Sequence, residues 1–456
     1  MSIRTILSTA ACKISRSIIR LLGRGGTNAP GVVALKIDPN LLGTLAQGVT
    51  TIIVTGTNGK TTTSRMIEKC LADSGIHYFA NKSGANLLPG ITAEFAMNST
   101  LGGKCKYDVA LIECDEAAFR TVSKYVDAKC IVVTNIFRDQ LDRYGEVTHT
   151  RNSILTGIKN SPHATVCINA DDSLCASLQE EITNPVVFYG VESEIYKERV
   201  HEVSDAPYCI HCKTEYVYDY VTYGHLGGFR CPKCGYHRPD AQVAVERVVE
   251  STADASTVDI RLNGKVYRTT INLPGGYNIY NACATVAAGK VLGLKDETVI
   301  EALGSFECGF GRMEKFSIEG TDIRMILIKN PAGCNQVLNF LSNTTQPSLF
   351  VVALNDRSAD GTDISWIWDV DFEKLAGITD KLTGIWVTGI RADEMALRFK
   401  YAGLPTQMIR VIYDYDSLIE QMVEQKAPVY IMPTYTAMLD IREKFSRKYG
   451  FKEFWE

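Results

Sequence analysis

A glycine loop followed by lysine and threonine carries the clearest chemical signal in the sequence. The loop consists of Gly56, Thr57, Asn58, Gly59, Lys60 and Thr61. It follows the β-branched run 51–54 and precedes an amphipathic segment, 64–71, which predicts strand, loop and helix in that order. Such a loop cradles phosphates, because its amides and the start of the helix face the anion. Lys60 would neutralise the β- and γ-phosphates of a nucleotide, and the Thr61 hydroxyl would bind Mg²⁺.

The match to the strict phosphate-loop pattern is incomplete. That pattern has a glycine five positions before the last loop glycine, where this chain has Val54, and Gly56 is offset by two. An ordinary glycine-rich turn before a helix is therefore the alternative interpretation.

Two further predicted strands end in side chains that suit a nucleotide and its metal. The apolar run 109–112 ends on Glu113, and a carboxylate at a strand tip beside a phosphate loop can hold Mg²⁺. A plain surface acid is the alternative. The run 130–134 predicts another buried strand, followed by Asn135 and Asp139. Ligands bind at the carboxyl ends of strands in an open α/β sheet, so we expect these residues near the phosphate loop.

Four cysteines have the spacing of a zinc ribbon. They are Cys209, Cys212, Cys231 and Cys234, two C-x₂-C pairs separated by eighteen residues. Each pair places two thiolates on one side of a metal, and four close a tetrahedron with no open position. We expect structural Zn²⁺ rather than unbound cysteines or a redox pair. His211 and His225 are predicted to lie outside the metal shell.

The composition is that of a soluble globular protein, and the length suffices for two or three cores. The chain has 456 residues, 22% of them charged, and a net charge of −4, so the whole chain offers no case for nucleic acid binding. No apolar run is long enough to suggest a membrane span. The 14 cysteines without an export signal favour a reducing, cytoplasmic location.

The first residues are basic and predict an amphipathic helix that ends at Gly23. Lys13 and Arg16 interrupt its apolar residues, unlike the continuous apolar core of a secretory signal. The helix either packs on the body of the protein or rests a basic face on anionic lipid at the inner face of the membrane.

The loop sequence TGTNGKTTT, which extends the cradle to Thr62, resembles the Mur ligase family. The family motif T-N-x-x-x-D-H-x-D is matched at Thr134, Asn135, Asp139 and Asp142, but Gln140 replaces its histidine. Later elements resemble the family's nucleotide helix, with Asn278 and Asn281, and the G-R-x-E that contains Arg312. The resemblance implies ATP and Mg²⁺ as cofactors, with these residues contacting the nucleotide.

Two departures from the family pattern bear on the nucleophile. The segment 144–155 lacks the lysine that many Mur ligases carbamylate to bind a second Mg²⁺. Where relatives have D-Y-A-H-N-P, this chain keeps Asn330-Pro331 but has Ile326 and Lys329 in place of Asp and His. An enzyme that accepts ammonia would not need the amino-acid site that those residues form.

The cysteine insert and the acidic, tryptophan-rich segment 351–373 are similar to the MurT subgroup, the synthetase subunits of lipid II isoglutaminyl synthase. This resemblance implies an ATP-dependent carbon–nitrogen ligase of peptidoglycan synthesis. It would convert the D-Glu α-carboxylate of the lipid II stem peptide to D-isoglutamine through an acyl phosphate, with ammonia from a GatD-type glutaminase. Asp356 is the expected aspartate that serves the glutaminase; Asp360 and Asp363 are its rivals, and a turn cap is the alternative.

We therefore expect three parts: a basic lead (1–48), a Mur-ligase-like central ATPase domain (49–311) with a Cys₄ zinc ribbon (199–241), and a Rossmann-like C-terminal domain (312–456). Two rival functions remain. A stand-alone amino-acid ligase would need added amino acid rather than ammonium. A non-enzymatic zinc-bearing scaffold would tolerate loss of Lys60.

Overall fold

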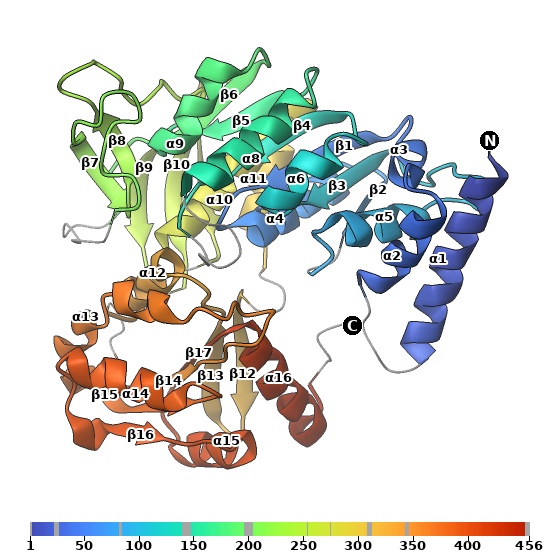
Figure 1. The fold of residues 1–456 in the computed structure, drawn as a ribbon. Helices are drawn as coiled ribbons and strands as arrows, with labels where there is room; N and C mark the ends of the chain where they lie inside the picture. The colour runs from blue at the N-terminus through green and yellow to red at the C-terminus, as the bar shows by residue number, and fades with distance from the viewer. Residues whose placement is uncertain are drawn as a thin grey trace.

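The computed structural model comprises two α/β units, each built around its own sheet (Figure 1). It describes residues 2–21, 27–81, 84–138, 147–195, 204–252, 254–273, 275–307, 312–342 and 346–451.

The first unit contains a nine-stranded sheet. The strand order is β11-β10-β9-β6-β5-β4-β1-β3-β2, and the strands from β2 to β9 in this order pair in parallel, whereas β9, β10 and β11 are antiparallel. The strands are β1 (Thr50–Thr55), β2 (Tyr78–Ala80), β3 (Val109–Glu113), β4 (Ala128–Val133), β5 (Thr165–Asn169), β6 (Val186–Val191), β9 (Val243–Ser251), β10 (Ser256–Leu262) and β11 (Lys265–Ile271). Since β1 lies between β4 and β3, the ends of all three strands meet at one edge, as the sequence predicted.

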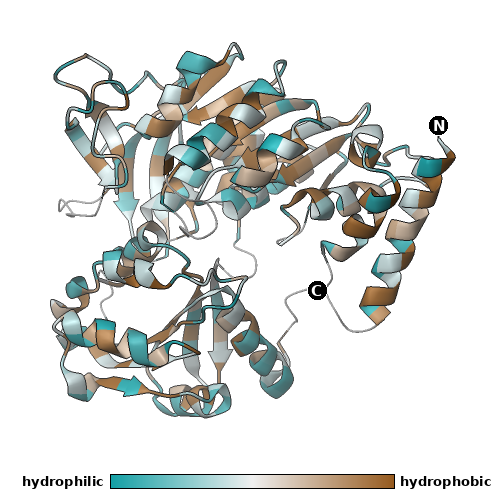
Figure 2. Ribbon diagram, viewed as in Figure 1, coloured by the Kyte–Doolittle hydropathy of each residue, from teal (hydrophilic) through white to brown (hydrophobic). Residues whose placement is uncertain are grey.

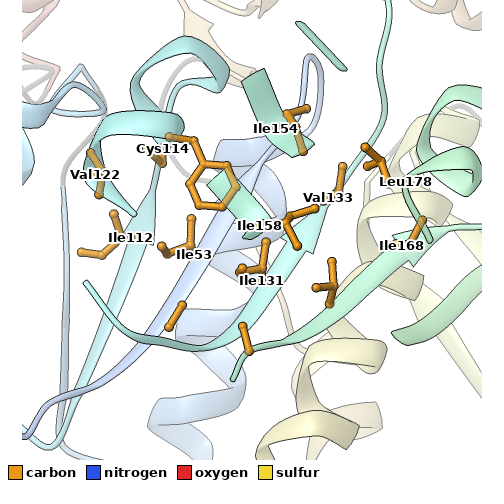
Figure 3. Close-up of a cluster of buried hydrophobic side chains, with 14 of the residues drawn as sticks. Ile53, Ile112, Cys114, Val122, Ile131, Val133, Ile154, Ile158, Ile168 and Leu178 are labelled. Carbon is orange, nitrogen blue, oxygen red and sulfur yellow. The ribbon is translucent and has the colours of Figure 1, made fainter. Parts of the chain in front are cut away.

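Helices cover both faces of this sheet. They are α4 (Lys60–Asp73), α5 (Leu88–Met97), α6 (Glu116–Val122), α8 (Val147–Lys159), α9 (Ser173–Ala176), α10 (Gly276–Leu292) and α11 (Asp296–Gly304). The alternation along β1 fills two cores: Ile53 faces one (Figure 3), while Ile52 and Val54 face the other, where α4 and α10 pack. Ile154 and Ile158 of α8 close the first core against the sheet.

The second unit is a six-stranded sheet in the order β12-β13-β17-β14-β15-β16. Only the β12–β13 pair is antiparallel. Its strands are β12 (Arg312–Ile318), β13 (Thr321–Ile326), β14 (Ser348–Ala353), β15 (Leu382–Thr388), β16 (Ile409–Val411) and β17 (Val429–Pro433). Its helices are α12 (Pro331–Ser342), α13 (Glu373–Ala376), α14 (Ala392–Tyr401), α15 (Tyr415–Glu424) and α16 (Tyr435–Tyr449). The mainly parallel sheet with helices on both faces agrees with the expected Rossmann-like unit.

Two small elements are attached to the first unit. Three N-terminal helices, α1 (Ile3–Leu21), α2 (Ala29–Ile37) and α3 (Leu41–Leu45), lie beyond the β2 edge, and α1 forms the outer wall of the molecule (Figure 1). A hairpin of β7 (Val217–Tyr223) and β8 (Leu226–Arg230) carries the cysteine segment beyond β9.

Candidate nucleotide site and cysteine cluster

The loop between β1 and α4 is shaped by hydrogen bonds to Asn135, which follows the neighbouring strand β4. The Thr57 amide donates to the Asn135 carbonyl at 2.8 Å, and the Asn58 amide donates to the Asn135 side-chain oxygen at 2.9 Å. The Asn135 amide group in turn donates to the Asn58 carbonyl at 3.1 Å. Asn135 therefore shapes the loop and also lines the cleft in front of it.

Lys60 is buried at the first position of α4. Its Nζ donates to the Gly56 carbonyl at 2.7 Å and to the Thr57 carbonyl at 3.3 Å, and it lies 3.3 Å from Glu116 Oε1. Glu116 begins α6, where the Asp115 carboxylate caps the helix. The lysine is thus held close to the loop by a buried carboxylate.

Thr61 and Glu113 lie together beside the loop. The Thr61 hydroxyl donates to Glu113 Oε1 at 3.0 Å, at the point where β3 ends. Asn81 fixes this strand end, accepting from the Glu113 amide at 2.8 Å and donating to its carbonyl at 2.8 Å. A hydroxyl and a carboxylate at this spacing are the oxygen donors that Mg²⁺ takes next to a phosphate cradle, so the residues present fit the ion.

Asn281 of α10 closes the loop from the other side. A Cβ at Gly59, whose φ is +86°, would lie 2.1 Å from the Asn281 side-chain oxygen, so only glycine fits there. That oxygen also accepts from the Thr63 hydroxyl at 3.3 Å, and the Asn281 amide group donates to Asn278 at 3.0 Å. The two asparagines predicted as nucleotide contacts therefore form one pair at the loop.

The second unit reaches the same loop. Lys329 Nζ donates to the Thr57 carbonyl at 3.2 Å, and the Asn330 amide group donates to the Asn58 side-chain oxygen at 2.9 Å. Between the units lies a cleft with about 710 Å³ of empty space, bounded on the other side by Tyr277. A nucleotide with its phosphates on the loop would have its remaining atoms in this cleft.

The side chains of two predicted site residues are not among those that the structure describes. Asp139 lies outside the described residues, and Arg312 begins β12 but its side chain is not among those described. Thr62 is described and buried in the first turn of α4.

The four predicted cysteines converge. Their Sγ atoms all lie within 4.8 Å of one another; Cys209 and Cys234 are 3.5 Å apart, and Cys212 and Cys231 are 3.4 Å apart. Four thiolates around one point, with Gly235 in the left-handed region at the second knuckle, fit a tetrahedral metal. Neither predicted bystander belongs to the cluster, since His211 lies 3.3 Å from Glu180 and His225 lies 3.3 Å from Asp172.

A buried ion pair ties the cysteine segment to α10. Arg238, which follows the second knuckle, donates from Nε to Asp171 Oδ1 at 2.6 Å. The Tyr280 hydroxyl donates to Asp171 Oδ2 at 2.5 Å, and it shares a 2.7 Å hydrogen bond with Thr222 of β7. Burial raises the pKa of Asp171. The charge of Arg238 and the hydrogen bonds that the carboxylate accepts oppose that rise. Tyr280 immediately precedes Asn281. The Asp171 carboxylate therefore stabilises both the cysteine hairpin and the Asn278–Asn281 pair.

Asp356 follows β14 and is paired with Arg391, whose Nη2 lies 2.7 Å from Asp356 Oδ2. Asp360 is buried and fully engaged within the fold, accepting from the Thr436 amide at 2.7 Å and hydroxyl at 2.5 Å. Asp363 is half-buried and accepts from the Ser365 amide at 2.8 Å. Among the three acids, Asp360 has a structural role at the start of α16 and Asp356 presents a charged pair near the surface.

Sequence reasoning missed Glu116, Tyr223 and the Asp171 network. Glu116 had a local signal, since it closes the acidic run after Glu113. Tyr223 lines the cleft from the cysteine hairpin and stacks on Phe137 with centroids 5.7 Å apart, which no local pattern indicates.

Comparison with known proteins agrees with this geometry. The Mur ligase middle domain matches residues 54–217, and the MurT ligase C-terminal domain matches residues 327–438. The lipid II isoglutaminyl synthase (glutamine-hydrolyzing) subunit MurT of Streptococcus pneumoniae is 35% identical over 446 residues, 97% of each chain. The subunit of the same name from Staphylococcus aureus is 34% identical over 438 residues, 96% of this chain and 97% of its own.

Solved structures show the same fold at low identity. MurF from Acinetobacter baumannii matches with a TM-score of 0.66 at 14% identity, covering 91% of this chain and 81% of its own. The pseudomurein peptide ligase type C of Methanothermus fervidus matches with a TM-score of 0.63 at 22% identity, covering 88% and 79%. With the phosphate loop, the cysteine insert and near full-length relatives in agreement, the chain belongs to the MurT family of Mur-ligase-fold synthetase subunits.

Proposed function

We propose that this ATP-dependent ligase amidates the α-carboxylate of D-Glu in the stem peptide of lipid II, giving D-isoglutamine, with ammonia supplied by a GatD-type glutaminase. The carrying observation is the Lys60 and Thr61–Glu113 arrangement at a phosphate loop that faces the cleft, in a chain whose near full-length relatives bear the lipid II isoglutaminyl synthase name. A carboxylate is a poor electrophile, and ATP provides the leaving group that amidation requires.

The reaction has two transfers. A carboxylate oxygen of D-Glu forms a bond to the γ-phosphorus of ATP, and the bond to the ADP oxygen breaks. The nitrogen of ammonia then attacks the acyl carbon, inorganic phosphate leaves with the electron pair of the C–O bond, and the nitrogen loses a proton. Both transition states develop negative charge on oxygen, so fixed cations and amides near the phosphates accelerate them.

Each residue of the loop has a defined part in this proposal. The amides of the loop bind the β- and γ-phosphates, and Lys60 moves its Nζ from the Gly56 carbonyl to phosphate oxygens while Glu116 limits how far it can swing. Thr61 and Glu113 would hold Mg²⁺, which neutralises phosphate charge when bound. Asn135, Asn278 and Asn281 position the nucleotide, as do Asp139 and Arg312 by resemblance to the family.

Lys329 is a further cation at this site. Its Nζ already donates to Thr57 of the phosphate loop, 3.2 Å away, from the position where Mur ligases carry histidine. This contact supports a role for Lys329 in holding the second unit against the phosphate loop, and the replacement of histidine by lysine supports a site adapted to ammonia rather than to an amino acid.

The four cysteines would bind structural Zn²⁺. A closed Cys₄ shell leaves no position for substrate, so the metal would stabilise the hairpin that carries Tyr223 to the cleft. It would have no part in the transfers.

Asp356 is proposed to serve the partner glutaminase. A glutaminase uses cysteine and histidine, commonly with an acid that orients the histidine. The Asp356–Arg391 pair supports this assignment over Asp360, whose oxygens are taken up within the fold.

Among the residues that the structure describes, no helix has the length and hydropathy needed to cross a membrane. Use of ATP and a lipid-linked substrate places the proposed reaction at the cytoplasmic face of the membrane, with peripheral contact between protein and lipid.

The test is to copurify the chain with its glutaminase and to follow lipid II by mass spectrometry with ATP, Mg²⁺ and glutamine. Conversion of OH to NH₂ that requires all three reagents supports the proposal. Turnover that requires an added amino acid, or no turnover with glutamine or with ammonium, would refute it.

A further inference from the structure

Helix α1 turns its aliphatic side chains away from the protein. Five of them form an exposed row, here called the α1 stripe: Ile3, Leu7, Ile14, Ile18 and Leu21. They are between 52% and 87% exposed, and at the α-helical repeat they fall within about 60° of one another around the axis. The residues that α1 buries are small and mostly polar: Thr5, Ser8, Thr9 and Cys12. Figure 2 shows this helix at the outer edge of the molecule, with solvent on its far side.

This orientation is the reverse of an ordinary surface helix, which buries its apolar stripe. It is fixed by specific contacts, because the Thr5 hydroxyl donates to Asp38 at 3.1 Å and the Ser8 hydroxyl donates to the Ala34 carbonyl at 2.7 Å. Arg16 also pairs with Glu94 of α5 at 3.0 Å. The polar face is therefore bonded to α2, α5 and the residues that follow α2, and among the described residues none covers the stripe, which can accept an apolar surface.

The charge around the stripe identifies that surface. Residues 1–37 contain six basic residues and no acidic residue, whereas the whole chain has 48 basic and 52 acidic residues. Arg20 and Lys36 are exposed. Three other cations of this segment bond to the body of the protein: Arg4 donates to the Ile37 carbonyl, Lys13 donates to the Ser99 carbonyl at 2.5 Å, and Arg16 pairs with Glu94.

We propose that the α1 stripe lies on an anionic membrane surface, with the helix parallel to the bilayer. Its aliphatic side chains would enter the boundary of the acyl chains, while Arg20 and Lys36 reach lipid phosphates. A second copy of the chain is a poorer occupant, because it would bring the same uncompensated cations together. The inference deepens the proposed function and rests on it for its purpose, which is to hold the cleft near a lipid-anchored substrate.

The test measures binding of the full-length chain to vesicles by sedimentation, without ATP or glutaminase. We expect binding to vesicles of phosphatidylcholine with phosphatidylglycerol, weakened by salt, and little binding to phosphatidylcholine alone. L7S/I14S/I18S should weaken binding at least roughly a hundredfold, since each substitution removes a side chain that would leave water. R20Q/K36Q should weaken it separately. V249S/V266S, which alters exposed valines of β9 and β11, should bind as the wild type does.

Three results would overturn the proposal: no binding of the wild type to anionic vesicles, equal binding by the stripe variant, or a wild-type dimer in sedimentation velocity that the stripe variant disperses. The stripe residues are exposed, so the variant should keep the wild-type melting temperature, and the charge variant tests the same surface independently. Failure of the proposed function would appear elsewhere, as absence of amidation on lipid II dissolved in detergent, without a bilayer. On that substrate the stripe variant should match the wild type.

Discussion

Replacing Arg238 by methionine tests whether the cysteine segment supports the nucleotide site through a buried charge. The Asp171 side chain is fully buried and that of Arg238 is 12% exposed, with 2.6 Å between Arg238 Nε and Asp171 Oδ1. Gly190 leaves room for the pair, since a Cβ there would lie 2.3 Å from the Asp171 carboxylate. Asp171 also accepts from Tyr280 of α10, so the pair and the nucleotide helix are connected directly.

The size of the effect follows from leaving a carboxylate buried without its cation. Removing one partner of a buried pair costs about 3–5 kcal/mol, which for a unit of this size lowers the melting temperature by roughly 6–20 °C. Two donors remain on Asp171, Tyr280 and the Val191 amide, which favours the lower part of that range.

The pH dependence has a definite sign. Burial already raises the pKa of Asp171 above its usual value, and loss of the arginine charge raises it further. A group whose pKa is raised on folding favours the folded state at low pH, and this contribution is lost as the pH rises. The destabilisation caused by R238M should therefore be smaller at about pH 5 than at about pH 7.

The assay is differential scanning calorimetry at both pH values, with ATP affinity measured by titration calorimetry. R268M is the matched control, because Arg268 is 57% exposed and its partner Asp259 keeps a second arginine, Arg247. We expect the control to keep a melting temperature close to that of the wild type, because an exposed ion pair contributes little to stability. A melting temperature for R238M equal to that of R268M, with unchanged ATP affinity, would refute the reasoning.

Three other predictions concern the site. K60M should lower ATP-dependent turnover by at least about a hundredfold in an ADP-release assay. The control K69M, which removes a lysine of the same helix that pairs with Asp73, should keep the wild-type turnover. Retention of most activity by K60M would contradict the role of Lys60. C231S should lose bound zinc in elemental analysis and lower the melting temperature, whereas C105S, which alters a cysteine outside the cluster, should keep the metal; full zinc content in C231S would exclude the Cys₄ site. D356N should abolish glutamine-driven amidation and spare amidation by added ammonium, with D363N as the control; loss of both activities would place Asp356 in the synthetase site instead.

The sequence predicted those parts of the site whose chemistry is encoded by local spacing. The phosphate loop, Glu113 at its strand tip and the four cysteines each have a short pattern with a physical cause, and the structure brings each set together. Contacts between distant segments have no such pattern. Lys329 and Thr57 are 272 positions apart, and the Asp171–Arg238 pair depends on where the cysteine segment folds back on the sheet. The sequence likewise does not predict that the α1 stripe points away from the protein. Periodicity shows that a helix has an apolar face but not which way that face points.

The contact of the second unit with the phosphate loop bears on how a reactive intermediate would be protected. Lys329 and Asn330 bond to Thr57 and Asn58, so the predicted phosphate loop is also the surface on which the two units meet. Any ligand that adds bonds to this loop from both sides favours the closed arrangement over an open one. An acyl phosphate hydrolyses in water, and closure around it excludes water while ammonia arrives from the partner. K329M should therefore raise ATP hydrolysis relative to amidation; a reduction of both in equal proportion would show that Lys329 acts on phosphoryl transfer and not on closure.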